Sequence, residues 1–376
     1  MPTAVVYGML LDDADELWPG RVELMYALAR RTSVVLLQRA RSRKESPRIE
    51  QIRENTFAVR GAFPLLADRK TKHMPGASAW ERRQFEALLT SAGIDDYVYW
   101  LSSPDIQLAR RSGTTRLVYD CIDPNFVPSR QRSFDRHERA VTRSAKVVFA
   151  TATALRTRME TFGADPILLP NATSPLAHER SPAPPELQRS GPIVGYLGTV
   201  DWRFDADTVF HAARALPDHT FAIVGRVNSE RREELGRLEA LPNVVVTGQV
   251  GYEAGERYVD AFDLAIIPFI PGPMSDAINP VKMYMYLRSG LPVVSTDIAE
   301  CRQNEFVRTA STPRAFAEAI VEAAMTNSAS QADARRAFAR VNTWQRRADD
   351  AWQSLERRGL VAGDGPEPSA STASPP

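Results

Sequence analysis

The sequence predicts an α/β fold made of two doubly wound, Rossmann-like domains that face each other across a cleft. Apolar, β-branched runs alternate with amphipathic stretches along most of the 376 residues, a pattern typical of parallel sheets covered by helices. A Pro-rich segment with little apolar content, residues 174–191, interrupts the alternation and predicts a linker. A chain of this length is long for one core and suits two domains.

The first half of the chain, residues 1–173, begins with a predicted strand over residues 4–10. No GxGxxG fingerprint follows that strand, which disfavours a dinucleotide cofactor. Residues 41–54 are polar and predict an exposed excursion. The other strands expected here are 33–38, 56–60, 97–101, 116–120, 146–151 and 166–170, and the helices are 21–31, 76–92, 105–111, 133–145 and 152–162.

Two carboxylates follow the strand over residues 116–120, which ends at Asp120 and is followed closely by Asp123. Ligands of open α/β sheets bind outside the carboxyl ends of the strands, so each Asp is a candidate general base. The alternative interpretation is that an Asp at this turn caps backbone N–H groups.

The second half, residues 192–342, repeats the alternation, and a long helix over residues 343–358 follows it. Residues 359–376 are rich in Gly, Pro, Ser and Ala and predict a disordered tail. The strands expected here are 193–198, 219–224, 243–247, 264–269 and 293–296, and the helices are 206–216, 252–261, 280–289, 298–304 and 313–325.

The strongest functional signal is the stretch DLAIIPFIPGPMSDAINPVKMYMYLRSGLPVVST, residues 263–296. It predicts strand, loop, helix and strand, with Pro280 in the first helical turn and Gly290 as a left-handed C′ residue. Lys282 falls in the first turn, where the helix dipole disfavours a cation. A phosphate bound between Lys282 and the helix N-terminus explains that position, and a solvated surface Lys is the alternative.

The motif Asn279-Pro280-Val281-Lys282-Met283-Tyr284-Met285-Tyr286-Leu287, with Gly290-Leu291-Pro292-Val293-Val294-Ser295-Thr296 after it, resembles the nucleotide-sugar site of GT-B glycosyltransferases. It is most similar to the branch of teichuronic-acid-type enzymes. The resemblance implies that Lys282 binds the donor diphosphate and that Arg203 is its charge partner. It also implies a donor site built from Gly198, Thr199, Gly248, Asn279, Pro280 and Val281, and a last helix that crosses back to the first domain.

The motif departs from that family at the ribose. Met285 stands where the family carries a glutamate that binds the donor ribose, and Ala277 stands where its partner glutamate is expected, beside Asp276. The xanthan glucuronosyltransferase, a related enzyme, shows a similar departure. Three possibilities then remain for the ribose. Another acid such as Asp276 holds it, backbone groups hold it, or no group holds it and the donor binds poorly.

On the acceptor side of the cleft, the resemblance places the loop after the first strand, with Trp18 and Arg21. Arg21 at a helix start suits contact with an acceptor or a donor phosphate. The alternative is that Arg21 pairs with the acidic loop before it.

Charge is unevenly distributed. Residues 1–173 hold 26 Lys and Arg against 20 Asp and Glu, a net charge of +6, and the remaining 21 against 26 give −5. Peripheral contact with the inner membrane face, or an anionic acceptor, is one interpretation of the basic half, and ordinary solvated surfaces are the other. Aromatic residues are sparse among the basic ones, which argues against nucleic-acid binding.

Two distant cysteines give neither a disulfide framework nor a metal cluster and indicate a reducing compartment. The N-terminus has no charged n-region or cleavage site of a signal peptide, and no apolar run approaches the roughly 18 residues that span a bilayer. A cytoplasmic protein, peripheral on the membrane at most, is therefore expected.

The sequence as a whole predicts a metal-independent glycosyltransferase, because no DxD motif lies at a predicted strand end. It is expected to move a sugar from a UDP- or GDP-sugar to a glycan or lipid-linked acceptor in polysaccharide assembly, with no other cofactor. The alternatives are a catalytically silent GT-B-like binding subunit and a nucleotide-sugar epimerase of the same fold.

Overall fold

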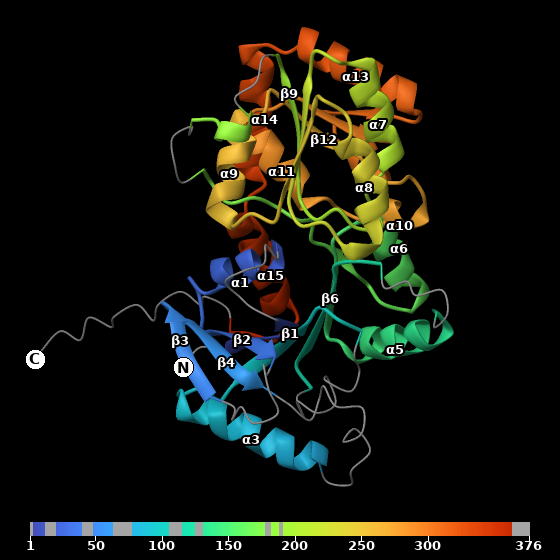
Figure 1. Ribbon diagram of the computed structural model, residues 1–376. Coiled ribbons are helices and arrows are strands. Elements are labelled where there is room, and N and C mark those ends of the chain that lie inside the picture. Colours follow the sequence, from blue (N-terminus) through green and yellow to red (C-terminus); the bar gives the residue numbers. More distant parts are fainter. Residues whose placement is uncertain are drawn as a thin grey trace, which may run out of the picture.

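The computed structural model describes residues 3–11, 20–39, 48–62, 77–104, 115–124, 131–176, 182–187 and 191–362. Two sheets form within these residues, one in each half of the chain, and Figure 1 shows the two halves stacked one above the other. The predicted fold class, an α/β protein with two doubly wound domains, is confirmed.

The sheet of the N-terminal domain has the strand order β3-β4-β2-β1-β5-β6-β7-β8. Its pairs are parallel except for β3, which runs antiparallel to β4 at the edge. The strands are β1 (Ala4–Leu11), β2 (Val34–Arg39), β3 (Arg48–Arg53), β4 (Thr56–Ala62), β5 (Tyr97–Leu101), β6 (Leu117–Cys121), β7 (Val147–Ala150) and β8 (Ile167–Leu168).

Strand β3 lies where the sequence predicted an exposed excursion, so that prediction was wrong. Its sequence RIEQIR buries no residue fully, because an edge strand with one open side needs little apolar content. Charged side chains such as Arg48 and Arg53 also protect an exposed edge against pairing with another chain. The polar composition therefore hid a strand.

Both faces of the N-terminal sheet are covered, and successive residues of β1 show how. Val5 and Tyr7 pack in one cluster with α1 (Gly20–Leu28) and α15 (Trp344–Arg357). Ala4 and Val6 point to the opposite cluster, as expected for alternating side chains of a strand. The helices of that second face are α3 (Ala77–Ser91), α5 (Gln131–Ser144) and α6 (Thr153–Thr161).

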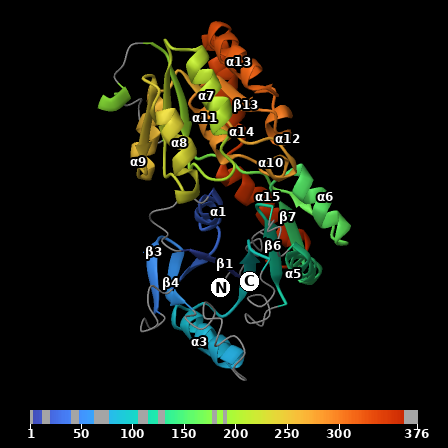
Figure 2. The ribbon, with the colours of Figure 1, turned by 45° about the vertical axis from the view of Figure 1, so that its right-hand side comes forward.

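Helix α15 joins the end of the chain to the N-terminal domain. Trp344, Ala348, Ala351 and Leu355 are buried in the same cluster as α1 and the strands of that domain. Figure 2 shows α15 beside α1, between the two domains. The domain that begins the chain is thus completed by its last helix.

The chain stays ordered beyond the point where the sequence predicted a disordered tail. Gly359 adopts a left-handed φ of 67° after α15. Leu360 and Val361 then pack in the core of the N-terminal domain. The prediction of a tail from residue 359 was wrong for these residues, and residues 363–376 lie outside the described part.

The sheet of the C-terminal domain is entirely parallel, in the order β11-β10-β9-β12-β13-β14. The order reverses between β9 and β12, and ligands of doubly wound sheets bind at such a switch point. The strands are β9 (Ile193–Leu197), β10 (Thr220–Val224), β11 (Val244–Gly248), β12 (Leu264–Ile267), β13 (Val293–Thr296) and β14 (Val307–Ala310).

The helices of this domain include α8 (Arg232–Glu239) and α14 (Ala329–Val341), which the sequence analysis missed together with β14. The others are α7 (Ala206–Ala215), α9 (Tyr252–Ala261), α10 (Pro273–Asp276), α11 (Val281–Arg288), α12 (Ala299–Arg302) and α13 (Pro313–Met325). Among the described residues, no helix combines the length and apolar character needed to cross a membrane.

Candidate functional site

A cleft of about 400 Å³ lies between the two domains. Each domain contributes residues that follow the ends of its strands, which is where ligands of parallel sheets bind. The N-terminal domain supplies Gly20, Arg21, Ile122, Asp123 and Asn171, and the C-terminal domain supplies Leu197, Gly198, Thr199, Arg203, Gly225, Arg226, Gln249, Val250, Ile278, Asn279, Val281, Lys282 and Met285.

The helix that carries the predicted phosphate site begins and ends as its sequence suggests. Pro280 is the N-cap residue of α11, and Lys282 is its second residue. At the other end Gly290 has a φ of 78°, and Leu291 N–H donates to the carbonyl of Tyr286. This is a Schellman motif. The motif stretch therefore aims its helix N-terminus and Lys282 at the cleft.

The ammonium of Lys282 is held between aromatic side chains. Its Nζ lies 3.1 Å from Tyr196 Oη and 4.4 Å and 4.6 Å from the ring centroids of Tyr196 and Phe269. Burial and, to a lesser extent, the nearby Arg203 lower the pKa of Lys282 to about 7, against smaller opposing effects of Asp201 and Cys301. Within the described part of the chain, no carboxylate lies within ion-pair distance of Lys282.

A close backbone approach places Lys282 against the loop after β9. A Cβ atom on Gly198 would lie 2.8 Å from Lys282 Nζ, and Gly198 has a φ of 150°. Tyr196 Oη donates to the carbonyl of Thr199 at 2.8 Å, which leaves its lone pair for Lys282. Gly198, Thr199 and Lys282 therefore come together as predicted at one wall of the cleft.

Arg203 extends this positive wall, although it is partly neutralised. Its Nε lies 3.0 Å and 3.1 Å from the two carboxylate oxygens of Asp201, and Nη2 also donates to Asp201. Burial opposes the charged form of Asp201, but the bonds from Arg203 hold its pKa below the usual range. Arg203 is thus fixed beside Lys282.

Of the two candidate bases, Asp123 opens into the cleft. Asp123 is exposed at the cleft, and desolvation by the surrounding protein nevertheless raises the pKa of its carboxyl. Arg203 opposes that rise, Asp201 adds to it, and Arg21 opposes it. Asp123 of the N-terminal domain thus lies within electrostatic reach of Asp201 and Arg203 of the C-terminal domain. A carboxylate with a raised pKa at this place has the properties of a general base.

Asp120 lies behind the cleft, so its predicted position as a base is corrected. Its side chain is fully buried, and its oxygens accept from Arg21 Nη2 at 2.8 Å and Trp100 Nε1 at 3.0 Å. A carboxylate occupied in this way cannot meet an acceptor hydroxyl. Asp120 instead fixes Arg21.

Arg21 lines the cleft, but its charge is paired inside the protein. Besides Asp120, its Nη2 donates to the carbonyl of Leu169 at 2.8 Å. The alternative, a pairing with the acidic loop before α1, falls on residues outside the described part, as does Trp18. Nε and Nη1 of Arg21 are buried and have no acceptor within the described residues.

Asn279 ties the start of α11 to the N-terminal domain. Its Oδ1 accepts from Asn171 N–H at 2.9 Å, its carbonyl accepts from Asn171 Nδ2 at 2.6 Å, and its Nδ2 donates to Glu300 at 2.9 Å. Glu300 in turn accepts from Thr153 N–H at 2.9 Å, across the same interface. Asn279 lines the cleft, yet its side chain already has partners, so it fits a role in positioning α11.

Three further predicted donor residues have different environments. Met285 lines the cleft and is 6% exposed. Asp276 accepts from Ala299 N–H at 2.7 Å, which engages its carboxylate with α12 instead of the cleft. Gly248 ends β11, and its carbonyl accepts from Gly225 N–H, so it shapes the loop whose next residue, Gln249, lines the cleft.

Sequence reasoning missed Tyr196, Arg226 and Gln249. Tyr196 is fully buried and appears in the sequence as one more apolar residue of a strand. Arg226 and Gln249 follow the neighbouring strands β10 and β11 and line the same end of the cleft. The rule that ligands meet strand ends indicated this position, but strand order was needed to bring the two together.

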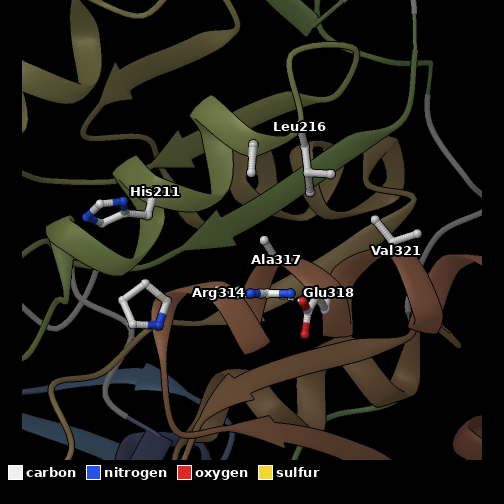
Figure 3. A pocket seen from close by; sticks show the side chains of 8 residues that line it. His211, Leu216, Arg314, Ala317, Glu318 and Val321 are labelled. Carbon is white, nitrogen blue, oxygen red and sulfur yellow. Dashed lines mark hydrogen bonds and ion pairs between the residues drawn. The ribbon is translucent and has the colours of Figure 1, made fainter.

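A second hollow, of about 390 Å³, lies on the C-terminal domain between α7 and α13, and Figure 3 shows its lining. His211 belongs to α7 and Leu216 is its C-cap residue, while Arg314 and Glu318 belong to α13. Arg314 and Glu318 pair with each other at 2.8 Å and are both exposed. No set of polar groups converges there among the described residues, in contrast to the cleft between the domains.

The described residues contain no group of three or more His, Cys, Asp or Glu side chains arranged to hold a metal ion. The charges that line the C-terminal wall of the cleft are instead cationic, from Lys282, Arg203 and Arg226. Asp123 is the carboxylate among the lining residues, and it belongs to the opposite wall.

Comparison with known proteins agrees with this geometry. Residues 191–325 match the family described as glycosyl transferases group 1. The C-terminal domain is a group 1 glycosyl transferase domain. The matched range contains the complete motif stretch, with Lys282, Arg203 and Met285, so the predicted resemblance is confirmed for this domain.

One curated relative is the putative teichuronic acid biosynthesis glycosyltransferase TuaH of Bacillus subtilis (strain 168). It is 31% identical over 123 residues, which are 32% of this chain and 31% of that protein. The chain thus matches about a third of the length of that relative.

The fold of the whole chain also occurs in solved glycosyltransferase structures. Sucrose-phosphate synthase from Thermosynechococcus elongatus is 16% identical with a TM-score of 0.70, covering 94% of this chain and 98% of that one. Anabaena HepE in complex with UDP and glucose is 14% identical with a TM-score of 0.66, covering 94% and 100%. At this identity the likeness shows the shared GT-B fold.

Proposed function

We propose that this protein is a glycosyltransferase that moves a sugar from a nucleotide-diphosphate sugar to an acceptor hydroxyl. The observation that carries the proposal is the environment of Lys282. A half-buried ammonium that faces a cleft without an ion-pair partner in the described residues is unfavourable by itself. An anion bound in the cleft supplies the counter-charge that the Lys282 ammonium lacks.

A diphosphate suits this position better than a carboxylate or a single phosphate. The N-terminus of α11, Lys282 and Arg203 adjoin one another at the switch point of the sheet. Helix N-termini and cations together stabilise phosphate oxygens, and their fixed positions stabilise the charge that grows on a leaving diphosphate. The protein's own cations therefore account for leaving-group stabilisation without a metal ion.

The nucleoside of the donor extends along the ends of β10 and β11 in this proposal. Arg226 and Gln249 offer hydrogen bonds to the nucleobase of the donor. The backbone near Gly225 and Val250 also lines this part of the cleft. The C-terminal wall offers no carboxylate to the ribose among the described residues. We infer that backbone groups hold the ribose hydroxyls, with Met285 packed beneath the sugar.

Asp123 acts as the general base in the proposed reaction. It removes the proton of the acceptor hydroxyl as the oxygen attacks the anomeric carbon and the nucleoside diphosphate leaves. Its raised pKa brings the carboxyl closer to neutral pH, where a base is most effective. Its position opposite Asp201 and Arg203 puts it on the acceptor side of the donor phosphates.

The acceptor is a growing glycan, and polysaccharide assembly is the expected context. The name of the TuaH relative and the basic N-terminal half support this part of the proposal. The HepE structure with UDP and glucose supports a nucleotide sugar as donor. Contact of the N-terminal half with an anionic membrane surface belongs to the same proposal.

The test is a panel of UDP, GDP and their common sugar conjugates, measured by thermal shift and then by calorimetry. We expect one nucleoside diphosphate to bind and its sugar conjugate to release it when a saccharide acceptor is added. Binding without turnover with any acceptor would favour a silent subunit. Epimerisation of the donor sugar in the absence of an acceptor would favour an epimerase. The comparisons support neither alternative.

A further inference from the structure

Trp202 stands out among the four tryptophans whose side chains the structure describes. Trp100, Trp344 and Trp352 are 0%, 4% and 5% exposed, whereas Trp202 is 47% exposed. A large aromatic side chain at the surface gives up the gain of burial and is often part of a binding surface. The question is whether its position relates it to the cleft.

The indole of Trp202 adjoins the cleft wall. The guanidinium carbon of Arg203, which lines the cleft, lies 5.7 Å from its ring centroid. The same guanidinium lies 5.8 Å from the ring of Phe269, which also packs against Lys282. Phe269 is buried, whereas Trp202 is exposed. The Arg203 guanidinium therefore lies near both the buried ring of Phe269 and the exposed ring of Trp202.

The loop that carries Trp202 is held in place. Asp201 accepts from both the backbone N–H and the side chain of Arg203. Ile270 N–H donates to the carbonyl of Arg203 at 2.7 Å, and Phe204 forms an antiparallel bridge with Phe269. Trp202 is therefore presented on a braced turn, and little conformational entropy is lost when a ligand binds it.

The opposite wall of the cleft indicates whether the acceptor or the donor lies near the Trp202 ring. Asp123 of the N-terminal domain lies within electrostatic reach of Asp201 and Arg203, the two neighbours of Trp202. An acceptor whose hydroxyl meets Asp123 therefore lies near the turn that carries Trp202. In the proposed function the donor phosphates belong at Lys282 instead.

The chemistry of the surface favours a sugar ring. Ile270, another large apolar side chain that is 43% exposed, is bonded to this turn through its backbone, because its N–H donates to the carbonyl of Arg203 beside Trp202. The electron-rich face of an indole attracts the polarised C–H groups on one face of a pyranose. Two side chains flanked by Asp201 and Arg203 make a small, charged-edged surface, which suits a saccharide better than a bilayer.

We propose that Trp202 stacks against a sugar ring of the acceptor, with Ile270 at the edge of the same subsite. This inference rests on the proposed glycosyltransferase function and deepens it: the acceptor is a saccharide whose ring is recognised, instead of a simple alcohol or a lipid phosphate. Trp202 is then a specificity-determining residue.

The experiment measures saccharide binding and donor binding separately. Methyl glycopyranosides and short oligosaccharides are titrated both without nucleotide and in the presence of a nucleoside diphosphate, by saturation-transfer NMR, on wild type, Trp202→Ala and Trp202→Phe. Met325→Ala is the matched control, because Met325 is an 82% exposed apolar residue on α13. We expect Trp202→Ala to weaken saccharide binding about tenfold and Trp202→Phe to weaken it less.

Nucleoside-diphosphate affinity should stay within about twofold of wild type in both variants, since the phosphates do not reach the indole. Unchanged saccharide binding in Trp202→Ala, or no saccharide binding by wild type, overturns the inference. Sedimentation with anionic phospholipid vesicles that Trp202→Ala alone abolishes would assign the ring to a membrane and also overturn it. Failure of every nucleotide to bind wild type counts against the proposed function, while the saccharide titrations still judge Trp202.

Discussion

Lys282 Nζ lies 3.1 Å from Tyr196 Oη and has the Tyr196 ring at 4.4 Å, so the cation of the motif helix rests on a residue of the first strand of the same domain. The Tyr196 hydroxyl donates to Thr199 and accepts from Lys282, which joins the loop after β9 to the start of α11. The two sides of the topological switch point are thus connected by one tyrosine. Tyr196 therefore fixes the position of the Lys282 ammonium in the cleft.

Lys282→Met should weaken binding of the nucleoside diphosphate by about 1.5–3 kcal/mol, the range for hydrogen bonds to charged groups. It should also stabilise the folded protein by about 0.5–2 kcal/mol, as often happens when a strained functional residue is replaced. Burial lowers the pKa of Lys282, so this gain should be complete below pH 7 and disappear as the pH rises further.

Calorimetry and chemical denaturation measure the two effects, with Lys146→Ala as control because Lys146 is an exposed lysine of the N-terminal domain. Unchanged diphosphate affinity in Lys282→Met would remove Lys282 from the donor site.

Donor affinity should depend on pH through Lys282. Its pKa of about 7 in the free protein means that it is mostly neutral at pH 8 and must take up a proton before it pairs with a diphosphate. Affinity for a nucleotide sugar should therefore fall by close to tenfold per pH unit above about 7. A sugar nucleotide is the right probe, since its diphosphate has no proton that titrates near neutral pH.

Lys282→Arg separates this effect from others, because a guanidinium stays protonated across the range. We expect its affinity to vary little with pH, even if it is lower than that of wild type. Calorimetry in buffers of different ionisation enthalpy should also detect proton uptake by wild type at pH 8. A flat pH profile for wild type contradicts the account of Lys282.

Asp123→Asn should reduce turnover by about 10²–10⁴-fold, the usual contribution of a general base. Donor affinity and thermal stability should stay near wild type, since Asp123 opens into the cleft. In wild type the raised pKa of Asp123 predicts that activity falls as the pH drops through a value above that of an ordinary carboxyl.

Asp120→Asn is the informative comparison, because its effect should appear in stability. Its carboxylate is fully buried beside Arg21, and removal of one partner of such a pair costs about 3–5 kcal/mol. Denaturation curves and turnover for both variants decide the assignment. Full activity in Asp123→Asn would exclude it as the base.

Transfer should persist in excess EDTA, since Lys282, Arg203 and the N-terminus of α11 supply positive charge to the leaving diphosphate in the proposed site. The measurement is release of nucleoside diphosphate before and after treatment with chelator. Restoration of lost activity by Mg²⁺ or Mn²⁺ would contradict this account. It would direct attention to Asp201, Asp276 and Asp205, the N-cap residue of α7.

The sequence predicted what depends on local pattern. The strand–helix–strand unit around Lys282, its Schellman end at Gly290 and the convergence of Gly198 and Lys282 all follow from turn chemistry and from the rule that ligands meet strand ends. Strand β3 was not predicted, because a charged edge strand lacks the apolar pattern by which strands are predicted from a sequence.

Long-range pairings were not predictable in the same way. Nothing in the sequence near Asp120 indicates that its partner is Arg21, 99 residues away. Likewise Asn279 resembles a ligand-binding residue of its motif, but its side chain pairs with Asn171 and Glu300. Such roles depend on the strand order and on how the two domains meet, and both become visible only in three dimensions.

Met285 is the residue at which the motif departs from its relatives, and the structure sharpens the prediction for it. It lines the cleft at 6% exposure on α11, one turn beyond Lys282. A carboxylate at position 285 would be an i, i+3 neighbour of Lys282 and would compete for its charge. A thioether leaves the ammonium to the diphosphate and packs against apolar surface.

We therefore expect Met285→Glu to remain folded and to bind the nucleotide sugar within about threefold of wild type, because new ribose contacts offset the partial neutralisation of Lys282. Met285→Gln, which offers hydrogen bonds without charge, is the matched control and should bind at least as well as wild type. Asp276→Ala should change donor affinity little, since that carboxylate is engaged with Ala299 N–H. Calorimetry with one nucleotide sugar measures all three variants. If wild type binds no nucleotide sugar and Met285→Glu restores binding, Met285 marks a lost site and the protein is a silent relative of the enzymes it resembles.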